Sequence, residues 1–109
     1  MAKAKRKPVP FQTGRVAITH GAVVALAHYD KWMDAVQASE FLLARHLFND
    51  WGDLDAHDRH ANDLAVRRNG RLLSSYDLKH TVPHERDRSV WIITEADRSA
   101  TTILLPSEY

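Results

Sequence analysis

The chain has no cysteine among its 109 residues. This absence excludes a disulfide scaffold, a thiol nucleophile and any metal site built from thiolates, and it suits a reducing cytoplasm. The sequence also lacks an apolar run near the roughly 20 residues that a membrane helix needs, and its basic start lacks the apolar stretch of a signal peptide. We therefore expect a soluble cytoplasmic protein with no membrane partner.

Glycine is scarce as well, and its four residues are scattered at positions 14, 21, 52 and 70. No glycine-rich loop is present to hold a phosphate group, and Ser74 and Ser75 lack the turn that presents a serine nucleophile. Because the sequence carries no catalytic signature, it favours a non-enzymatic role, and no cofactor is expected.

Charge is distributed unevenly along the chain. Residues 11–109 hold 11 of the 15 basic groups and all 14 acidic groups, which gives this part a net charge of −3. The first ten residues carry only basic groups, namely Lys3, Lys5, Arg6 and Lys7. We expect residues 1–10 to be a flexible, solvated tail and residues 11–109 to form one small domain. The alternative is that the four cations contact the phosphates of a nucleic acid, which would add salt-sensitive affinity without sequence specificity.

Helix signals fill the middle of the chain. A short β-branched strand at residues 15–19 ends at Thr19, whose hydroxyl can cap a first helix. A second helix is clear from Ser39 and ends near residue 49, and a third is expected at Ala56–Arg68. The third helix is capped by Asp53 or Asp55, and the predicted core face is formed by Ala61, Leu64 and Ala65.

Strand signals dominate the last third of the chain. From residue 71 the apolar period changes to two, and residues 90–95 and 100–105 are rich in Val, Ile, Leu, Thr and Trp around a polar turn at residues 96–99. We therefore predict an α+β fold in a single domain, with an N-terminal strand, two to three helices and then a three-stranded antiparallel meander. The N-terminal strand can pair with this meander, and the helices are expected to cover one face of the sheet.

Several motifs carry a resemblance to a known family. They are Asp50-Trp51-Gly52-Asp53, the pair Asp58 and Asn62, Ser75-Tyr76, and the C-terminal string from Trp91 to Tyr109. Over about residues 15–109 the chain resembles a family of small bacterial proteins carried on plasmids and integrated elements, sometimes labelled as a type I restriction methylation subunit. The methylation label has no support in this sequence, because a glycine-rich methyl-donor loop and an Asn-Pro-Pro-Tyr motif are both missing.

The family-like motifs also supply the candidate binding residues. We expect Trp51 and Trp91 to be structural anchors, with a functional surface beside them. This surface is expected to comprise Asp50, Asp53, Asp58, Asn62, Glu95, Asp97 and Arg98.

Histidines offer a weaker hypothesis. His57 and His60 lie one turn apart on the predicted third helix, so a metal site is geometrically possible. The nearby carboxylates are Asp53, Asp55 and Asp58. A solvated helix face explains the same pattern without a ligand, and we expect no metal. His46 on the second helix is expected to be hydrogen-bonded at the edge of the core.

The favoured function is an accessory protein of a bacterial mobile genetic element that binds a protein or nucleic-acid partner. One alternative is a small toxin or nuclease, because the element order is similar to that of RelE-type and ParE-type toxins. That activity requires a cationic, concave sheet face holding at least two of Tyr76, Glu95, Arg98 and a histidine. The other alternative is a protein inhibitor of a host defence system, which would present a flat apolar or mixed-charge patch.

Overall fold

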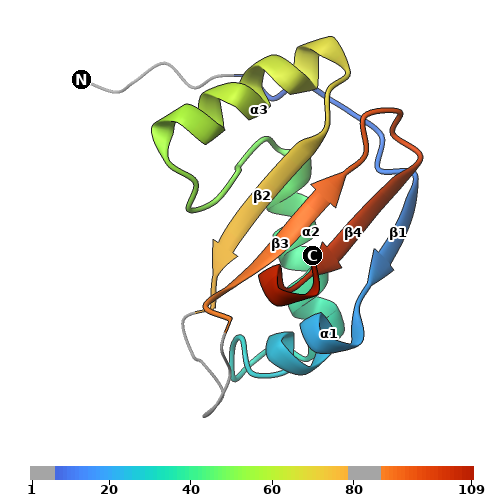
Figure 1. Ribbon diagram of the computed structural model, residues 1–109. Coiled ribbons are helices and arrows are strands. Elements are labelled where there is room, and N and C mark those ends of the chain that lie inside the picture. The colour runs from blue at the N-terminus through green and yellow to red at the C-terminus, as the bar shows by residue number, and fades with distance from the viewer. Residues whose placement is uncertain (1–6, 79–86) are drawn as a thin grey trace.

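Four strands form one mixed sheet, with three α-helices around it (Figure 1). The computed structural model describes residues 7–78 and 87–109. In chain order the elements are β1 (Arg15–Ile18), α1 (His20–Leu26), α2 (Ala35–Leu47), α3 (Ala56–Arg68), β2 (Leu72–Asp77), β3 (Ser89–Thr94), β4 (Ala100–Leu104) and the short 3₁₀ helix η1 (Pro106–Glu108).

The strand order across the sheet is β1-β4-β3-β2. The last three strands form the predicted antiparallel meander, in which Trp91 lies opposite Ser75 on one side and Leu104 on the other. The N-terminal strand joins beside β4 and runs parallel to it, with Val16 opposite Thr101. The sheet is therefore mixed, because the helical connection returns the chain to the far edge before the meander begins.

The starts of the first two helices are fixed by side-chain caps. The Thr19 hydroxyl accepts a hydrogen bond from the backbone N–H of Ala22 at 3.2 Å, which confirms the predicted start of α1. The sequence makes the second helix clear from Ser39 and leaves residues 29–38 open as helix or loop, and the structure starts α2 at Ala35. Asp34 and Gln37 form a capping box there, and these polar contacts start the helix before its apolar period becomes visible.

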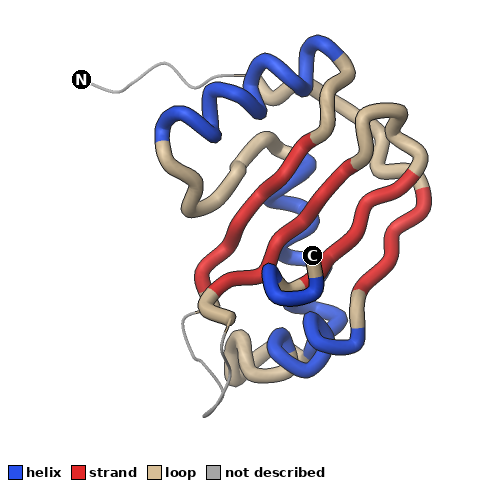
Figure 2. Tube along the Cα trace, in the orientation of Figure 1, coloured by secondary structure: helices blue, strands red, loops and turns tan. Residues whose placement is uncertain are grey.

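The third helix has the predicted bounds but a different buried face. Ala61 and Leu64, which were expected in the core, are exposed, and Asn62 and Val66 are buried instead. The apolar pattern was misleading because α3 packs beside β2 at one end of the sheet, where a polar side chain meets the strand's free backbone groups (Figures 1 and 2).

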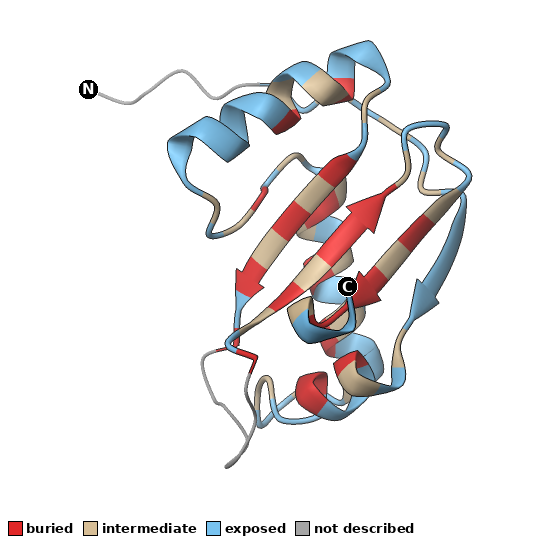
Figure 3. Cartoon of the chain, viewed as in Figure 1, coloured by how far each residue is buried: buried red, intermediate tan, exposed pale blue. Residues whose placement is uncertain are grey.

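The main core lies between the sheet and the helices α1 and α2. In Figure 1, α2 lies behind the sheet and α1 lies at its lower end. The strand residues that contribute to this core are buried, and among them are Tyr76, Val90, Ile92 and Ile103. Leu72 belongs to a second, smaller cluster with Trp51 and Val66. Figure 3 shows buried and less buried positions alternating along β2. Side chains alternate along each strand, so the opposite face carries Leu73, Ser75, Trp91, Ile93, Thr102 and Leu104. We call this second side the open face, because none of the described α-helices packs on it as α2 packs on the other side; Ile93 and Leu104 on it are still buried, at 3% and 7% exposed. The C-terminal turn η1 lies in front of it in Figure 1.

The N-terminal segment contacts the domain from Val9 onward. The Val9 N–H donates to Asn49 Oδ1 at 2.6 Å, and Asn49 Nδ2 donates to the Val9 carbonyl at 3.2 Å. The next apolar residue, Phe11, packs its ring against those of His46 and Trp51, with centroids 5.3 and 6.5 Å away. Residues 1–6 of the expected basic tail lie outside the described residues, whereas Val9 is tied to α2's C-terminal end.

Candidate functional site

The outer edge of β2 is closed by the side chain of Asn62 from α3. Asn62 Nδ2 donates to the Leu73 carbonyl at 2.7 Å, and the Leu73 N–H donates to Asn62 Oδ1 at 3.2 Å. The side-chain amide thus pairs with the strand as a neighbouring peptide group would. Because Asn62 is buried and fully engaged here, its role in this structure is to satisfy the sheet edge.

The loop after α2 closes the rest of the same edge. The Ser75 N–H donates to the Trp51 carbonyl at 3.1 Å, and the Asp53 N–H donates to the Ser75 carbonyl at 2.7 Å. One carboxylate oxygen of Asp53 accepts from the Asp77 N–H at 2.8 Å. Trp51 is 2% exposed, as its anchoring role requires, and its indole N–H donates to Asp63 at 2.9 Å.

Asp50 stabilises the turn that leads into this loop. Its two carboxylate oxygens accept from the Gly52 N–H at 3.2 Å and from Arg45 Nε at 2.6 Å. Partial burial acts to raise the pKa of Asp50, but the hydrogen bonds from Arg45 and Gly52 outweigh it and lower the pKa. The Asp50 carbonyl also accepts from the buried Tyr76 hydroxyl at 2.7 Å.

Arg98 ties the β3–β4 turn to the C-terminal end of α3. Its guanidinium donates to the Gly70 carbonyl at 2.6 Å and to the Glu95 carbonyl at 3.1 Å, with a longer contact to the Ala65 carbonyl at 3.4 Å. The Ala65 carbonyl already accepts from the Gly70 N–H at 2.8 Å, and the negative end of the helix dipole makes a cation favourable beside it. Within the same turn, Asp97 Oδ1 accepts from the Ser99 N–H at 2.9 Å.

The predicted binding residues therefore make two groups of structural contacts. Most of them hold backbone groups at the β2 edge or at the β3–β4 turn. The group at the β2 edge comprises Asp50, Asp53 and Asn62. The group at the β3–β4 turn comprises Glu95, Asp97 and Arg98. Asp58 is exposed on α3.

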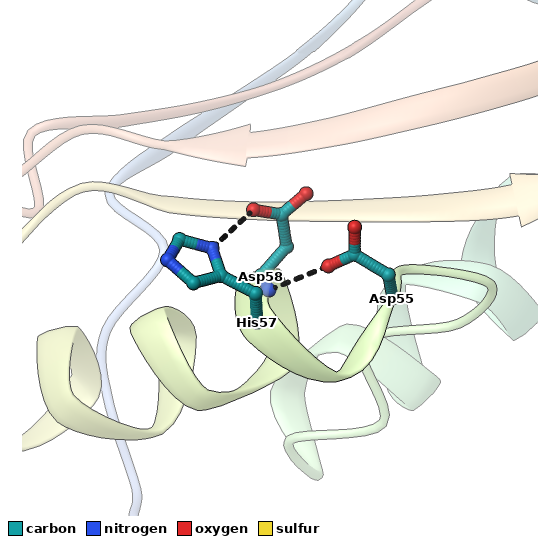
Figure 4. Close-up of side chains that lie close together, drawn as sticks. All are labelled: Asp55, His57 and Asp58. Carbon is teal, nitrogen blue, oxygen red and sulfur yellow. Dashed lines mark hydrogen bonds and ion pairs between the residues drawn. The ribbon is translucent and has the colours of Figure 1, made fainter.

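Of the residues considered for a metal site, Asp55, His57 and Asp58 lie together (Figure 4). Their candidate ligand atoms lie within 4.8 Å of one another. Asp55 caps α3, accepting from the Asp58 N–H at 2.8 Å, and Asp58 contacts His57 Nδ1 at 3.4 Å. All three side chains are exposed, and His60 is outside the group. Helix capping explains the arrangement without a metal ion.

His46 lies at the centre of a buried polar network. Its side chain is 0% exposed, with Nδ1 at 2.5 Å from Ser74 Oγ and Nε2 at 2.9 Å from Thr94 Oγ1. Thr94 Oγ1 lies 2.8 Å from Thr101 Oγ1, which donates to the Thr13 carbonyl at 2.8 Å. The expected hydrogen-bonded histidine is therefore present, deep in the core and not at its edge.

The network determines which nitrogen of His46 carries the proton. The Thr101 hydroxyl donates its only proton to the Thr13 carbonyl, so it can only accept a hydrogen bond from Thr94. Because the Thr94 hydroxyl proton is used in that bond, Thr94 Oγ1 must accept a hydrogen bond from His46 Nε2–H. Nδ1 then accepts from Ser74. Burial, together with the charge of Arg98, lowers the pKa of His46 to about 4. A pKa shifted this far can mark a catalytic group, but an imidazole closed off from solvent has no access to a substrate.

Four side chains form a cluster on the open face, and no pattern in the sequence predicts that they contact one another. Trp91 and Tyr109 lie with ring centroids 5.7 Å apart, and the Arg71 guanidinium lies 5.2 Å from the Tyr109 ring. Arg71 Nη1 donates to the Tyr109 hydroxyl at 2.5 Å, and Arg71 Nε lies 3.4 Å from a Glu95 carboxylate oxygen. We call these four residues the aromatic cluster. Trp91 is only partly buried, which differs from the core anchor expected from the sequence.

Sequence reasoning singled out Trp91 and Glu95 but missed Arg71 and Tyr109. Arg71 and Tyr109 are 38 positions apart, so nothing local in the sequence indicates their hydrogen bond. The only available signal was the presence of an arginine directly before a predicted strand that neighbours Trp91.

Comparison with known proteins adds no identification. No family model, curated protein or solved structure matches this chain. Within residues 7–78 and 87–109, none of the helices has the length and apolar character needed to cross a membrane.

Proposed function

We propose that this chain is an accessory protein of a bacterial mobile genetic element that acts by binding a protein partner through the aromatic cluster. The observation that carries this proposal is the composition and packing of the cluster on the open face. Tryptophan, tyrosine and arginine are enriched among the few residues that dominate the binding energy of protein interfaces. The mobile-element assignment is supported by the family-like motifs alone.

The charges around the cluster favour a protein over a nucleic acid. Arg71 is paired with Glu95, and Asp77 ends the neighbouring strand, so this region is mixed in sign. A nucleic-acid surface concentrates positive charge, which supplies most of its affinity. The alternative contact through Lys3, Lys5 and Arg6 lies outside the described residues, and Lys7 is exposed.

The nuclease alternative is less well supported. Tyr76 is 0% exposed and its hydroxyl is bonded to the Asp50 carbonyl, so it cannot contact a substrate. Arg98 is engaged by carbonyls at the end of α3. The inhibitor alternative is a special case of protein binding, and the mixed charge of the aromatic cluster supports it.

The test is affinity capture from the cells that express the protein, with and without nuclease treatment. Tyr109→Ala removes the cluster's most exposed ring, and Trp32→Ala is the matched control because Trp32 is 80% exposed. We expect wild type and the control to recover the same protein after nuclease, and Tyr109→Ala to lose it. Circular dichroism checks that both variants are folded.

Two outcomes contradict the proposal. Loss of the captured protein after nuclease treatment would indicate a nucleic-acid partner. Equal capture by Tyr109→Ala and wild type would remove the aromatic cluster from the binding surface.

A further inference from the structure

The two edge strands of the sheet, β2 and β1, differ in whether their outward backbone groups are hydrogen-bonded. The backbone groups of Leu73 and Ser75 on the outer edge of β2 are paired with Asn62 and with the Trp51–Asp53 loop. Among the described residues, none covers the outer edge of β1 in this way, and all four residues of β1 are exposed. In Figure 1, no described helix or strand lies beside β1 on the side away from β4.

The hydrogen bonds to β4 show which groups of β1 point outward. The Arg15 N–H donates to Ser99 and the Thr19 N–H donates to Ile103, at 3.0 and 2.9 Å. Backbone groups alternate in direction along a strand, so the N–H and C=O groups of Val16 and Ile18 point away from β4. Within residues 7–78 and 87–109, no backbone group pairs with these donors and acceptors.

The strand β1 is short and carries one charge, Arg15 at its start, but its other side chains do not protect the sheet edge. The strand is Arg-Val-Ala-Ile, with no proline and no lysine. Val16 and Ile18 are 44% and 38% exposed. An uncovered edge of this kind is a template for pairing with another strand.

We propose that β1 pairs antiparallel with β1 of a second copy of this chain, with the two-fold axis at Ala17. In this register Val16 of each copy lies opposite Ile18 of the other, and the outward groups of both residues are used. Each strand offers two outward N–H groups, so the pair forms four hydrogen bonds. The result is one continuous eight-stranded sheet.

The side chains in this register are complementary to themselves. Val16 meets Ile18, a β-branched apolar pair on the same face of the sheet. Ala17 meets its own copy at the axis, in the close type of antiparallel pair where a small side chain fits. Arg15 lies across from Thr19, so no like charges face each other. This self-complementarity favours a second copy as the occupant.

The dimer goes beyond the proposed function and does not depend on it. A two-fold axis between antiparallel edge strands is perpendicular to the sheet, so both open faces lie on the same side. Two aromatic clusters would then face the same direction, which would give bivalent binding to a repeated partner.

The sharpest test uses the absence of cysteine from the natural chain. Ala17→Cys introduces the only thiol, and the two copies of this residue would lie close enough for a disulfide. Ala61→Cys is the matched control, because Ala61 is an exposed alanine on α3. Under mild oxidation we expect Ala17→Cys to form a covalent dimer at least tenfold faster than the control.

Sedimentation equilibrium tests the dimer without a cross-link. We expect the mass of the wild-type protein to rise from 12.4 kDa toward twice that value over about a hundredfold range of concentration, since a small interface associates weakly. Val16→Pro removes an outward N–H without removing a bond to β4, so it should remain folded and monomeric. Val36→Lys, at a residue that is 63% exposed on α2, should still dimerise.

The proposal is overturned if Ala17→Cys cross-links no faster than Ala61→Cys. It is also overturned if the wild-type mass stays at 12.4 kDa throughout the concentration range. If Val16→Pro proves unfolded by circular dichroism, Ala17→Glu replaces it. That change places like charges opposite each other at the axis and should likewise abolish the dimer.

Discussion

His46 should make the stability of this protein strongly dependent on pH. The pKa of His46 is lowered from 6.5 to about 4 in the folded protein, because the imidazole is buried and lies near the charge of Arg98. The unfolded chain therefore binds this proton more readily than the folded one. Between about pH 6.5 and pH 4 the free energy of unfolding should fall as the pH falls, and it should be at its full value above this window.

The size of the effect follows from the pKa difference. A difference of about 2.5 units corresponds to about 3 kcal/mol, and about 2.5 kcal/mol of this is lost between pH 7.5 and pH 4.5. This is a large share of the roughly 5 to 15 kcal/mol that stabilises a typical domain. For a domain of this length the loss corresponds to about 10 to 20 °C in melting temperature.

Urea unfolding at several pH values measures this contribution. His46→Gln keeps a polar side chain in the network but cannot titrate in this range, so its free energy of unfolding should fall less with decreasing pH than that of wild type. The absolute stability of the variant is not the readout, because any change in a buried network is costly. His28→Gln, at an exposed position, should keep the wild-type slope.

A direct observation of the imidazole completes the test. In NMR spectra, the ring resonances of His46 should keep the chemical shifts of a neutral imidazole down to about pH 5. The explanation fails if His46 titrates near pH 6.5, or if wild type and His46→Gln lose stability equally on acidification.

Three further predictions concern residues whose roles the structure assigns. Asn62→Ala leaves both backbone groups of Leu73 without partners and should cost about 1–3 kcal/mol in chemical unfolding, and an unchanged midpoint would contradict this role. Arg98→Ala should cost a similar amount, and Arg98→Lys should recover only part, since lysine lacks the fork that reaches several carbonyls. Added zinc should leave the melting temperature unchanged, and a rise that His57→Ala abolishes would establish a metal site.

Local signals in the sequence were sufficient for most of the secondary structure. Thr19 and Asp55 are caps that act within three residues, and the period of two after residue 71 reflects burial of one side of a strand. The antiparallel meander followed from the short polar turn at residues 96–99. Such features depend on neighbours in the chain, so they can be read without tertiary contacts.

The prediction of a binding surface followed residue type, and residue type does not show what a side chain touches. Acidic, amide and arginine side chains are equally suited to bind a partner or to satisfy the backbone. The structure places Asp53 and Asn62 on the outer edge of β2, which they help to close, and Arg98 beside the Gly70 carbonyl just after α3. The sequence could not show that these side chains lie within hydrogen-bond distance of the backbone groups that they contact.

The sequence by itself determined most of the elements, two of the helix caps, and the absence of any thiol chemistry in these residues. Only the tertiary structure decided that β1 runs parallel to β4, that His46 is enclosed, and that Arg71 meets Tyr109. The physical reason is range. Helices, turns and strand periodicity arise from contacts within a few residues, whereas the buried network and the aromatic cluster join side chains that are 28 and 38 positions apart, and folding alone brings these together.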